Sequence, residues 1–340
     1  MRPLGAQSGA VTSTRAQRAA VRLEAAPPLA ALQSGPMPAR VGNVLVGTAS
    51  WTERTLLESG AFYPPGVKKP EDRLRYYASQ FPIVEVDSTY YFPPTERNAA
   101  LWSERTPADF TFDVKAYSLL TRHPTRPASL AEDLRESVAP ENREKRFLYA
   151  SHLPPDVVEE VWRRFRDALM PLHSAGKLGV VHFQYPEWFL PGRESRDYVL
   201  ECARHLPDYR IAVEFRNAAW MNERNQQRTL AFLREHRIPY TSVDMPQGFR
   251  SSLPPVAAAT APDIAYVRFH GRNVDQWEGK HDTATPRFAY LYSQEELEEW
   301  VPKIKDLAAQ AREVHVLMNN CYRDYAVVNA RQLSALLTEE

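Results

Sequence analysis

The stretch that decides the fold class is a strand–helix–strand unit within residues 178–216. It begins with LGVVHFQY at 178–185, continues with helical periodicity at 195–205 and ends with RIAVEFR at 210–216. Two β-rich runs joined by an amphipathic segment predict a pair of parallel strands with a helical crossover. Repetition of such a unit along a chain is typical of an α/β fold.

The same alternation extends in both directions from this unit. Six further β-rich runs occur at 44–50, 83–89, 110–117, 239–245, 264–271 and 314–320. Helical periodicity fills the gaps at 72–80, 96–104, 156–174, 225–236, 294–312 and 325–337, and only 246–263 lacks a clear helix. Eight parallel strands with helical crossovers predict a TIM-type (β/α)8 barrel, as a single domain over residues 41–340. No GxGxxG or GxxxxGK[ST] motif occurs, although an open doubly wound sheet usually has one after its first strand.

The composition is that of an ordinary globular chain of 340 residues, with 44% hydrophobic and 25% charged residues. Lys+Arg and Asp+Glu balance at 42 each, so the net charge does not support a protein that binds nucleic acid mainly through its phosphates. A localised basic cleft is still compatible with this balance. The two cysteines, Cys202 and Cys321, are too few for a disulfide framework or a thiolate zinc site, which favours a reducing, cytoplasmic location.

Residues 1–40 are rich in Ala, Pro and Arg and hold a single acidic residue. We interpret them as a disordered tail. The tail has no apolar run of about 7–15 residues, as a signal peptide would need, and the whole chain has no run of about 20 that could span a membrane. We therefore expect a cytoplasmic protein with no membrane partner.

Alternation along each strand separates a face that packs on the helices from a face that points into the barrel. In the run 210–216 the apolar face is Ile211, Val213 and Phe215, which leaves Glu214 and Arg216 for the lumen. The same reasoning places many polar side chains of the other strands in the lumen or at its carboxyl end. They are Glu85, Asp87, Asp113, Lys115, His182, Gln184, Ser242, Asp244, Tyr266, Arg268, His270, Asn319 and Asn320.

This predicted lumen is unusual, because barrel interiors are ordinarily packed with Val, Ile and Leu. Buried ions cost several kcal/mol each, so these groups must be paired, hydrogen-bonded or close to solvent. One interpretation is a structural ion-pair network. The other is an active site, because barrels carry their chemistry at the carboxyl ends of the strands. Two long connections, 118–155 and 272–293, follow strand ends on that face, and we interpret them as functional lids.

Residues 44–330 resemble the YecE-like proteins, known as domain of unknown function 72. The matching motifs occur in order: GTASW at 47–51, FYP at 62–64, FPIVEVDSTYYFPP at 81–94, FTFDVKAY at 110–117, AVEFRNAAW at 212–220, YVRFHGR at 266–272 and MNNCYRDYAVVNA at 318–330. The resemblance implies a barrel of the triosephosphate-isomerase type and no established activity.

Several positions that are typical of this family are present in the chain. They are Trp51, Glu85, Ser88, Thr89, Tyr90, Lys115, His123, Glu214, Arg216, Trp220, Arg268, His270, Arg272, Asn319, Asn320 and Asn329. The chain departs from the family pattern at Asp87, where Asn is usual, and at Met318, where Phe is usual.

The first functional hypothesis is an enzyme that acts on a phosphate- or carboxylate-bearing substrate by acid/base chemistry, with no cofactor and no metal. Its catalytic residues would be Glu214, Asp244, His270 and Lys115. Its substrate-binding residues would be Arg216, Arg268, Arg272, Trp51, Tyr90, Asn319, Asn320 and Trp220. This hypothesis predicts that Lys115, Glu214, Arg216, Asp244, Arg268 and His270 converge on one water-accessible cavity. A purely structural, hydrogen-bonded role for His270 is the alternative.

Two further hypotheses stay open. One is a divalent-metal-dependent sugar isomerase or phosphodiesterase whose ligands would be Glu85, Glu214, Asp244 and His270, although neighbouring arginines would compete for those carboxylates. The other is a non-catalytic module that binds a nucleotide or single-stranded nucleic acid. Its stacking side chains would be Trp51, Tyr90, Tyr91, Trp220 and Trp277, unless these rings simply pack under loops.

Overall fold

A computed structural model describes residues 40–279 and 285–339. The predicted N-terminal tail lies outside the described residues except for Arg40. That residue belongs to β1 (Arg40–Val41), which pairs antiparallel with β2 (Val44–Thr48). The described part of the chain therefore begins one residue before the predicted domain boundary.

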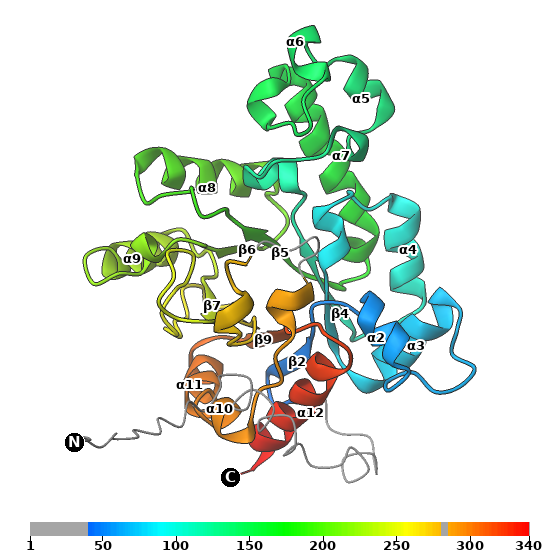
Figure 1. The fold of residues 1–340 in the computed structure, drawn as a ribbon, viewed down its shortest axis with the longest axis vertical. Coiled ribbons are helices and arrows are strands. Elements are labelled where there is room, and N and C mark those ends of the chain that lie inside the picture. The colour runs from blue at the N-terminus through cyan, green and yellow to red at the C-terminus, as the bar shows by residue number, and fades with distance from the viewer. Residues whose placement is uncertain (1–39, 280–284, 340) are drawn as a thin grey trace, which may run out of the picture. The chain divides into compact units, whose positions relative to one another are not determined.

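Parallel strands form the wall of a barrel (Figure 1). In the described residues they are β2, β3 (Ile83–Val86), β4 (Thr111–Lys115), β5 (Leu178–Gln184), β6 (Ile211–Glu214), β7 (Thr241–Asp244), β8 (Ile264–Phe269) and β9 (Glu313–Met318).

The order of the strands around the barrel follows the sequence. The last strand, β9, pairs with the first parallel strand, β2. Between β6 and β7 there is one isolated bridge, Val213 to Tyr240, and Val213 N donates to Pro239 O at 2.9 Å. This joint completes the ring, which confirms the predicted TIM-type barrel.

Helices cover the outside of the wall, and they follow the strands as the alternation predicts. The larger ones are α3 (Pro70–Gln80), α4 (Glu96–Glu104), α7 (Pro155–Ser174), α8 (Arg193–His205), α9 (Gln226–Glu235), α11 (Val301–Gln310) and α12 (Tyr325–Thr338). In Figure 1, α4 lies beside α7, and α12 packs beside β2, the first strand of the barrel.

The single helix predicted over 294–312 is wrong, because two helices occupy this segment. They are α10 (Gln294–Glu298) and α11 (Val301–Gln310). Pro302 lies in the first turn of α11. A proline has no N–H for the carbonyl four residues earlier and its ring clashes with that carbonyl, here Glu298, so a continuous helix cannot pass this point.

The connections also differ in content. Residues 246–263 contain no helix, as predicted. The connection 118–155 contains α5 (Glu132–Glu136) and α6 (Pro140–Arg143), together with short 3-10 turns. Of the connection 272–293, residues 280–284 lie outside the described part of the chain.

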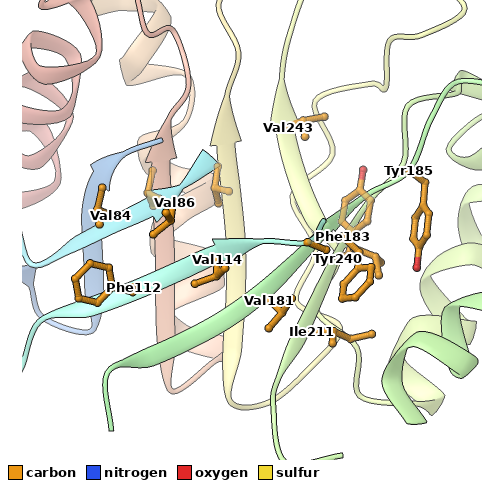
Figure 2. Packing of buried hydrophobic residues seen from close by; sticks show 14 of the residues in the cluster. Val84, Val86, Phe112, Val114, Val181, Phe183, Tyr185, Ile211, Tyr240 and Val243 are labelled. Carbon is orange, nitrogen blue, oxygen red and sulfur yellow. The ribbon is translucent and has the colours of Figure 1, made fainter. Parts of the chain in front are cut away.

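Apolar side chains of alternate strand residues pack between the wall and the helices. Figure 2 shows Val84 and Val86 of β3, Phe112 and Val114 of β4, and Val181 and Phe183 of β5, all of them buried. A second, smaller apolar cluster contains residues of the opposite parity. It consists of Leu45, Ile83, Val180, Ala212, Ile264, Tyr266 and Leu317. The lumen is thus apolar in part, and its polar side chains occupy the remaining positions.

The facing predicted for β7 is wrong. Its register pairs Val243 with Arg268 and Asp244 with Phe269. Paired residues of neighbouring strands share a face, so Val243 shares the lumen face of Arg268 and Asp244 points toward the helices. Alternation failed here because Thr241–Asp244 has polar residues at both parities. We then assigned the face that carries Asp244 to the lumen because it is charged, and this assignment is wrong.

Gly179 of β5 lies where the lumen is too closely packed for a side chain, and a substitution there tests this packing. A Cβ atom at this position would lie 2.3 Å from Asp113 Oδ1 and 2.9 Å from His315 Cε1. We expect Gly179→Ala to lower the free energy of unfolding by about 1–3 kcal/mol through overpacking, measured by urea denaturation. Gly192→Ala is the control, because its Cβ would meet no atom within 4 Å. Equal stability of the two variants would contradict the expectation.

Candidate functional site

A buried ionic cluster lies where β3, β4, β5, β6, β8 and β9 end, and Arg268 of β8 is at its centre. Arg268 has no exposed surface; its Nη2 donates to Glu85 Oε1 at 2.6 Å and its Nη1 donates to Glu214 Oε2 at 2.8 Å. Nη2 also lies 3.8 Å from Asp87 Oδ1. One guanidinium therefore contacts three acidic side chains, from β3, from the turn that follows it and from β6. The ionic cluster consists of Glu85, Asp87, Lys115, His182, Gln184, Glu214, Arg216, Tyr266, Arg268, His270 and Asn319.

Glu214 accepts hydrogen bonds from most of its neighbours. Besides Arg268, its Oε1 atom accepts from Gln184 Nε2 at 2.6 Å, His270 Nε2 at 3.1 Å and Arg216 Nη1 at 3.3 Å. Burial acts to raise the pKa of Glu214, but His270 and Arg268 hold it well below its usual range. The group is therefore a carboxylate at neutral pH, and it holds Arg216 in place.

Both ring nitrogens of His270 are engaged. Its Nδ1 lies 2.8 Å from Asn319 Nδ2, which donates, and its Nε2–H donates to Glu214. Burial lowers the pKa of His270 to about 4, so the ring is neutral and this pattern selects the Nε2–H tautomer. The ring thus has no lone pair left for a substrate in this arrangement.

Glu85 is the carboxyl group with the opposite behaviour. Its Oε2 accepts from Tyr266 OH at 2.8 Å and lies 3.4 Å from His182 Nδ1. Burial raises the pKa of Glu85 to about 8 even though Arg268 is adjacent. Burial also lowers the pKa of His182 to about 4, so the ring is neutral at pH 7.

Besides Glu85, the ionic cluster contains three cations and two carboxylates. The cations are Lys115, Arg216 and Arg268, and the carboxylates are Asp87 and Glu214. Because burial disfavours the ionised form of Glu85, the charge balance of the ionic cluster is shifted in the positive direction. An anion that reached it would be attracted.

Three charged members of the ionic cluster reach solvent. The side chains of Lys115, Arg216 and Asp87 are 12%, 17% and 31% exposed. Lys115 Nζ lies 3.0 Å from Asp87 Oδ1. Burial acts to raise the pKa of Asp87, but Lys115 and Arg268 hold it below its usual range. These side chains form the open edge of the cluster. Two of them, Lys115 and Arg216, are positively charged, and we call them the outer cations.

His123 stands beside this edge. Its Nδ1 lies 2.8 Å from Thr121 Oγ1, and that hydroxyl donates to Ser118 O at 3.1 Å. The hydroxyl must then accept from Nδ1–H, which leaves the Nε2 lone pair of His123 available. Burial lowers the pKa of His123 to about 3, and the charges of Lys115 and Arg216 lower it further in the same direction. Both cations are thus close enough to act on this ring.

The comparisons with known proteins agree with this architecture. Residues 45–340 match a family model described as "Protein of unknown function DUF72". The chain belongs to the DUF72 family. The resemblance found in the sequence is thereby confirmed.

Relatives of this DUF72 chain include the UPF0759 protein YunF of Bacillus subtilis, which is 31% identical over 300 residues, covering 87% of this chain and 95% of YunF. A DUF72 family protein from Enterococcus faecalis V583 has a crystal structure with a TM-score of 0.70 and 25% identity, covering 87% of this chain and 96% of that one. A DUF72 family protein from Thermotoga maritima MSB8 gives a TM-score of 0.68 and 31% identity, covering 87% and 99%. The family and the fold are therefore shown, and the site has to be argued from its residues.

Asp244 and Arg272 of this DUF72 chain lie outside the ionic cluster, on the helix side of the wall. Asp244 Oδ1 accepts from Tyr292 OH at 2.7 Å, and its Oδ2 accepts from Trp300 Nε1 at 2.7 Å and from Arg272 Nη2 at 2.8 Å. Arg272 also donates to Glu299 at 2.7 Å. The predicted convergence of six side chains is therefore wrong for Asp244. The other five belong to the cluster, in which Glu214, Arg268 and His270 have no exposed surface, so the predicted water-accessible cavity stays a prediction.

Three other predicted binding residues are packed away from the cluster. Trp220 is buried, stacks on Phe215 with ring centroids 3.9 Å apart and donates to a backbone carbonyl. Trp51 is buried and meets Trp102 edge-on. Asn320 donates to the side chain of Asn329 on α12 at 2.8 Å. These contacts explain why the three residues stabilise loops beside the barrel.

Tyr90 and Trp277 do contact the outer cations. Lys115 Nζ lies 5.1 Å from the centre of the Tyr90 ring, and the Arg216 guanidinium lies 4.8 Å from the Trp277 ring. Cations over aromatic faces are attracted by the electron density of the ring. Of the predicted aromatic residues, these two are the ones that adjoin the open edge.

The sequence reasoning missed His315 of β9. Its Nδ1 lies 2.9 Å from Asp113 Oδ2, and both side chains are fully buried. Burial acts to lower the pKa of His315, but Asp113 raises it to about 9. Gly179 and Glu313, which adjoin this pair, also line a pocket of about 220 Å³ at the amino ends of the strands. The sequence does indicate this position, because Val314 and Val316 face the helices and the residue between them must then face the lumen.

Two features of the described residues bear on the remaining hypotheses. Among residues 40–279 and 285–339, no three or more His, Cys, Asp or Glu side chains are arranged to hold a metal ion. None of the helices in these ranges has the length and apolar character that crossing a bilayer requires.

Proposed function

We propose that this DUF72 chain is an enzyme that acts on a phosphate- or carboxylate-bearing substrate by acid/base chemistry at the carboxyl-terminal mouth of the barrel. The observation that carries the proposal is the placement of Lys115 and Arg216 on the open edge of the ionic cluster. Within the described part of the chain, Arg216 Nε has no hydrogen-bond partner. A buried donor without a partner is costly, and an anion at the edge would satisfy it.

The proposal gives each group a role. Lys115 and Arg216 bind the anion of the substrate through charge-assisted hydrogen bonds. Glu214 and Arg268 position Arg216, since Glu214 accepts from both guanidinium groups. His270, whose nitrogens are both engaged, holds the Glu214 carboxylate in place.

His123 is the group we assign to proton transfer, because its Nε2 lone pair is available beside both outer cations. In the free protein burial lowers the pKa of His123, and the two cations lower it further. A bound anion opposes the charge of the cations and so raises the pKa of His123, which is the direction that a general base requires. Binding of the substrate would thus prepare the base that acts on it.

The metal-dependent hypothesis receives no support from the ligand set. The Arg268 guanidinium lies 2.6 Å from Glu85 and 2.8 Å from Glu214, so it occupies the carboxylate lone pairs that a cation would need. Asp244, the third carboxylate of that hypothesis, is bound to Arg272 on the other side of the wall. We therefore propose no metal centre.

Thermal stability measured with inorganic phosphate, ribose 5-phosphate and gluconate tests the proposal. A ligand at about 100 times its dissociation constant stabilises the folded protein by about 2.7 kcal/mol, so at least one of the three should raise the melting temperature. Lys115→Met should abolish this shift, because it removes one of the two outer cations. Lys115→Arg should retain part of it.

Lys68→Met is the matched control, since Lys68 is exposed and lies in the segment before α3, on none of the strands that carry the cluster. It should keep the wild-type shift. Retention of the full shift by Lys115→Met would contradict the anion site. The absence of any shift with all three ligands would contradict the proposed substrate class.

A further inference from the structure

Exposed apolar side chains gather on one end of the barrel. Within the described residues, six large apolar side chains are exposed, each to between 42% and 59%. Five of them lie on segments that follow the carboxyl ends of strands: Tyr91, Phe92, Trp188, Leu190 and Val274. Single exposed apolar residues need no explanation, but a concentration of them marks a surface that contacts something.

Four rings of this region form a continuous row, which we call the aromatic ladder. Tyr91 meets Tyr90 at 5.0 Å between ring centroids, Tyr90 meets His123 at 5.3 Å, and His123 meets Trp188 at 6.0 Å. Each contact is edge-to-face. The rings come from the connections after β3, β4 and β5, so the ladder crosses three neighbouring strands. Its two ends, Tyr91 and Trp188, are the exposed members.

The aromatic ladder runs beside the open edge of the ionic cluster. Lys115 Nζ lies 5.1 Å from the Tyr90 centroid, and the charges of Lys115 and Arg216 both act on the His123 ring. Exposed rings next to cations match a ligand in which a planar ring and an anionic group are close together. Either feature alone would fit many ligands, whereas the combination is selective.

The backbone supplies an independent observation. Arg122, immediately before His123, has a φ of 62° in the left-handed region, which costs free energy for a residue other than glycine. Its side chain is fixed by stacking 4.1 Å above Tyr198 and by a 2.9 Å bond to Glu194. Arg122 ends the 3-10 turn Ser118–Thr121, a position at which the left-handed conformation is common, so this conformation fixes where the chain leaves the turn toward His123. The middle of the ladder is therefore held in position.

We propose that the substrate carries a planar aromatic ring joined to its anionic group, as a nucleoside monophosphate does. The ring stacks on Trp188 while the phosphate binds Lys115 and Arg216. This inference rests on the proposed function and names the substrate class of the same site. Stacking tolerates different bases, because every base has an aromatic face.

Isothermal titration of the full chain at pH 7 tests the inference with four probes: adenosine 5′-monophosphate, uridine 5′-monophosphate, ribose 5-phosphate and inorganic phosphate. Both nucleotides should bind more tightly than ribose 5-phosphate. Trp188→Ala should weaken nucleotide binding about 5- to 100-fold and leave ribose 5-phosphate unchanged. Trp188→Phe should keep most of the affinity, because it retains a ring.

Met170→Ala is the matched control, since Met170 is the exposed apolar residue that lies on α7 away from the ladder. It should bind all four probes like the wild type. Phosphate and ribose 5-phosphate that bind as well as the nucleotides would overturn the inference and leave the proposed function standing. Failure of all four probes would overturn both.

Analytical ultracentrifugation of the same variants examines another occupant of this surface. A dimer that forms in the wild type, disappears in Trp188→Ala and is unaffected by nucleotide would show that a second copy covers the ladder, which would overturn the inference. A monomer in all variants, with the nucleotide preference above, supports it.

Discussion

Replacing Arg268 by methionine should lower the free energy of unfolding by about 3–5 kcal/mol at pH 7. The Arg268 guanidinium is fully buried and makes bonds of 2.6 and 2.8 Å to Glu85 and Glu214. Methionine fills a similar volume but leaves the Glu214 carboxylate without its main partner in a region of low dielectric. Removal of one member of a buried pair costs far more than the pair itself contributes, because the remaining ion stays desolvated.

Urea denaturation of the wild type and the variant measures this loss. Arg193→Met is the matched control: Arg193 also pairs with a carboxylate, Asp197, but its side chain is 91% exposed. Exposed pairs contribute at most about 1 kcal/mol, so the control should stay close to the wild type. A loss for Arg268→Met no larger than that of the control would mean that Arg268 is not the electrostatic centre of the cluster.

The second large effect is a pH dependence that comes from His315. Its folded-state pKa of about 9 is above the value of about 6.5 for an unfolded chain, so folding favours the imidazolium. The stabilisation is fully present below about pH 6.5 and is lost as the pH rises through 9. Each pKa unit corresponds to about 1.4 kcal/mol, so about 3 kcal/mol should disappear over this range.

The measurement is the difference in unfolding free energy between the wild type and His315→Gln at a series of pH values from 6 to 10. This difference should fall by about 3 kcal/mol as the pH rises. Taking the difference cancels the titration of Glu85, whose pKa of about 8 lies in the same window and is common to both proteins. A difference that is constant with pH would show that His315 is not charged in its pair with Asp113.

The fold could be predicted from the sequence because strand and helix periodicities alternate clearly along the chain. In β6, for example, Ile211 and Val213 are apolar and Glu214 is not, so both the strand and its faces follow from alternation. Local pattern is enough where burial on one face dominates. It fails where a single residue overrides it, as Pro302 does in dividing the helix predicted over 294–312.

The candidate site could be predicted only in part, because pairing depends on partners that are distant in the sequence. Lys115, Glu214, Arg216, Arg268 and His270 follow from strand parity. The location of Asp244 does not, because its partners belong to the segment after β8 and to the residue before α11. His123 lies in a connection with no periodicity at all, so alternation says nothing about which of its nitrogens is available.

The ionic cluster also helps to hold the barrel closed. Between β6 and β7 the backbone supplies one bridge, whereas Arg268 of β8 binds Glu214 of β6 and so spans the intervening strand. The ion pair between Arg268 and Glu214 thus reinforces the wall where β6 and β7 share few backbone hydrogen bonds. Separation of β6 from β7 and β8 would therefore also move Glu214 away from Arg268 and take the ionic cluster apart.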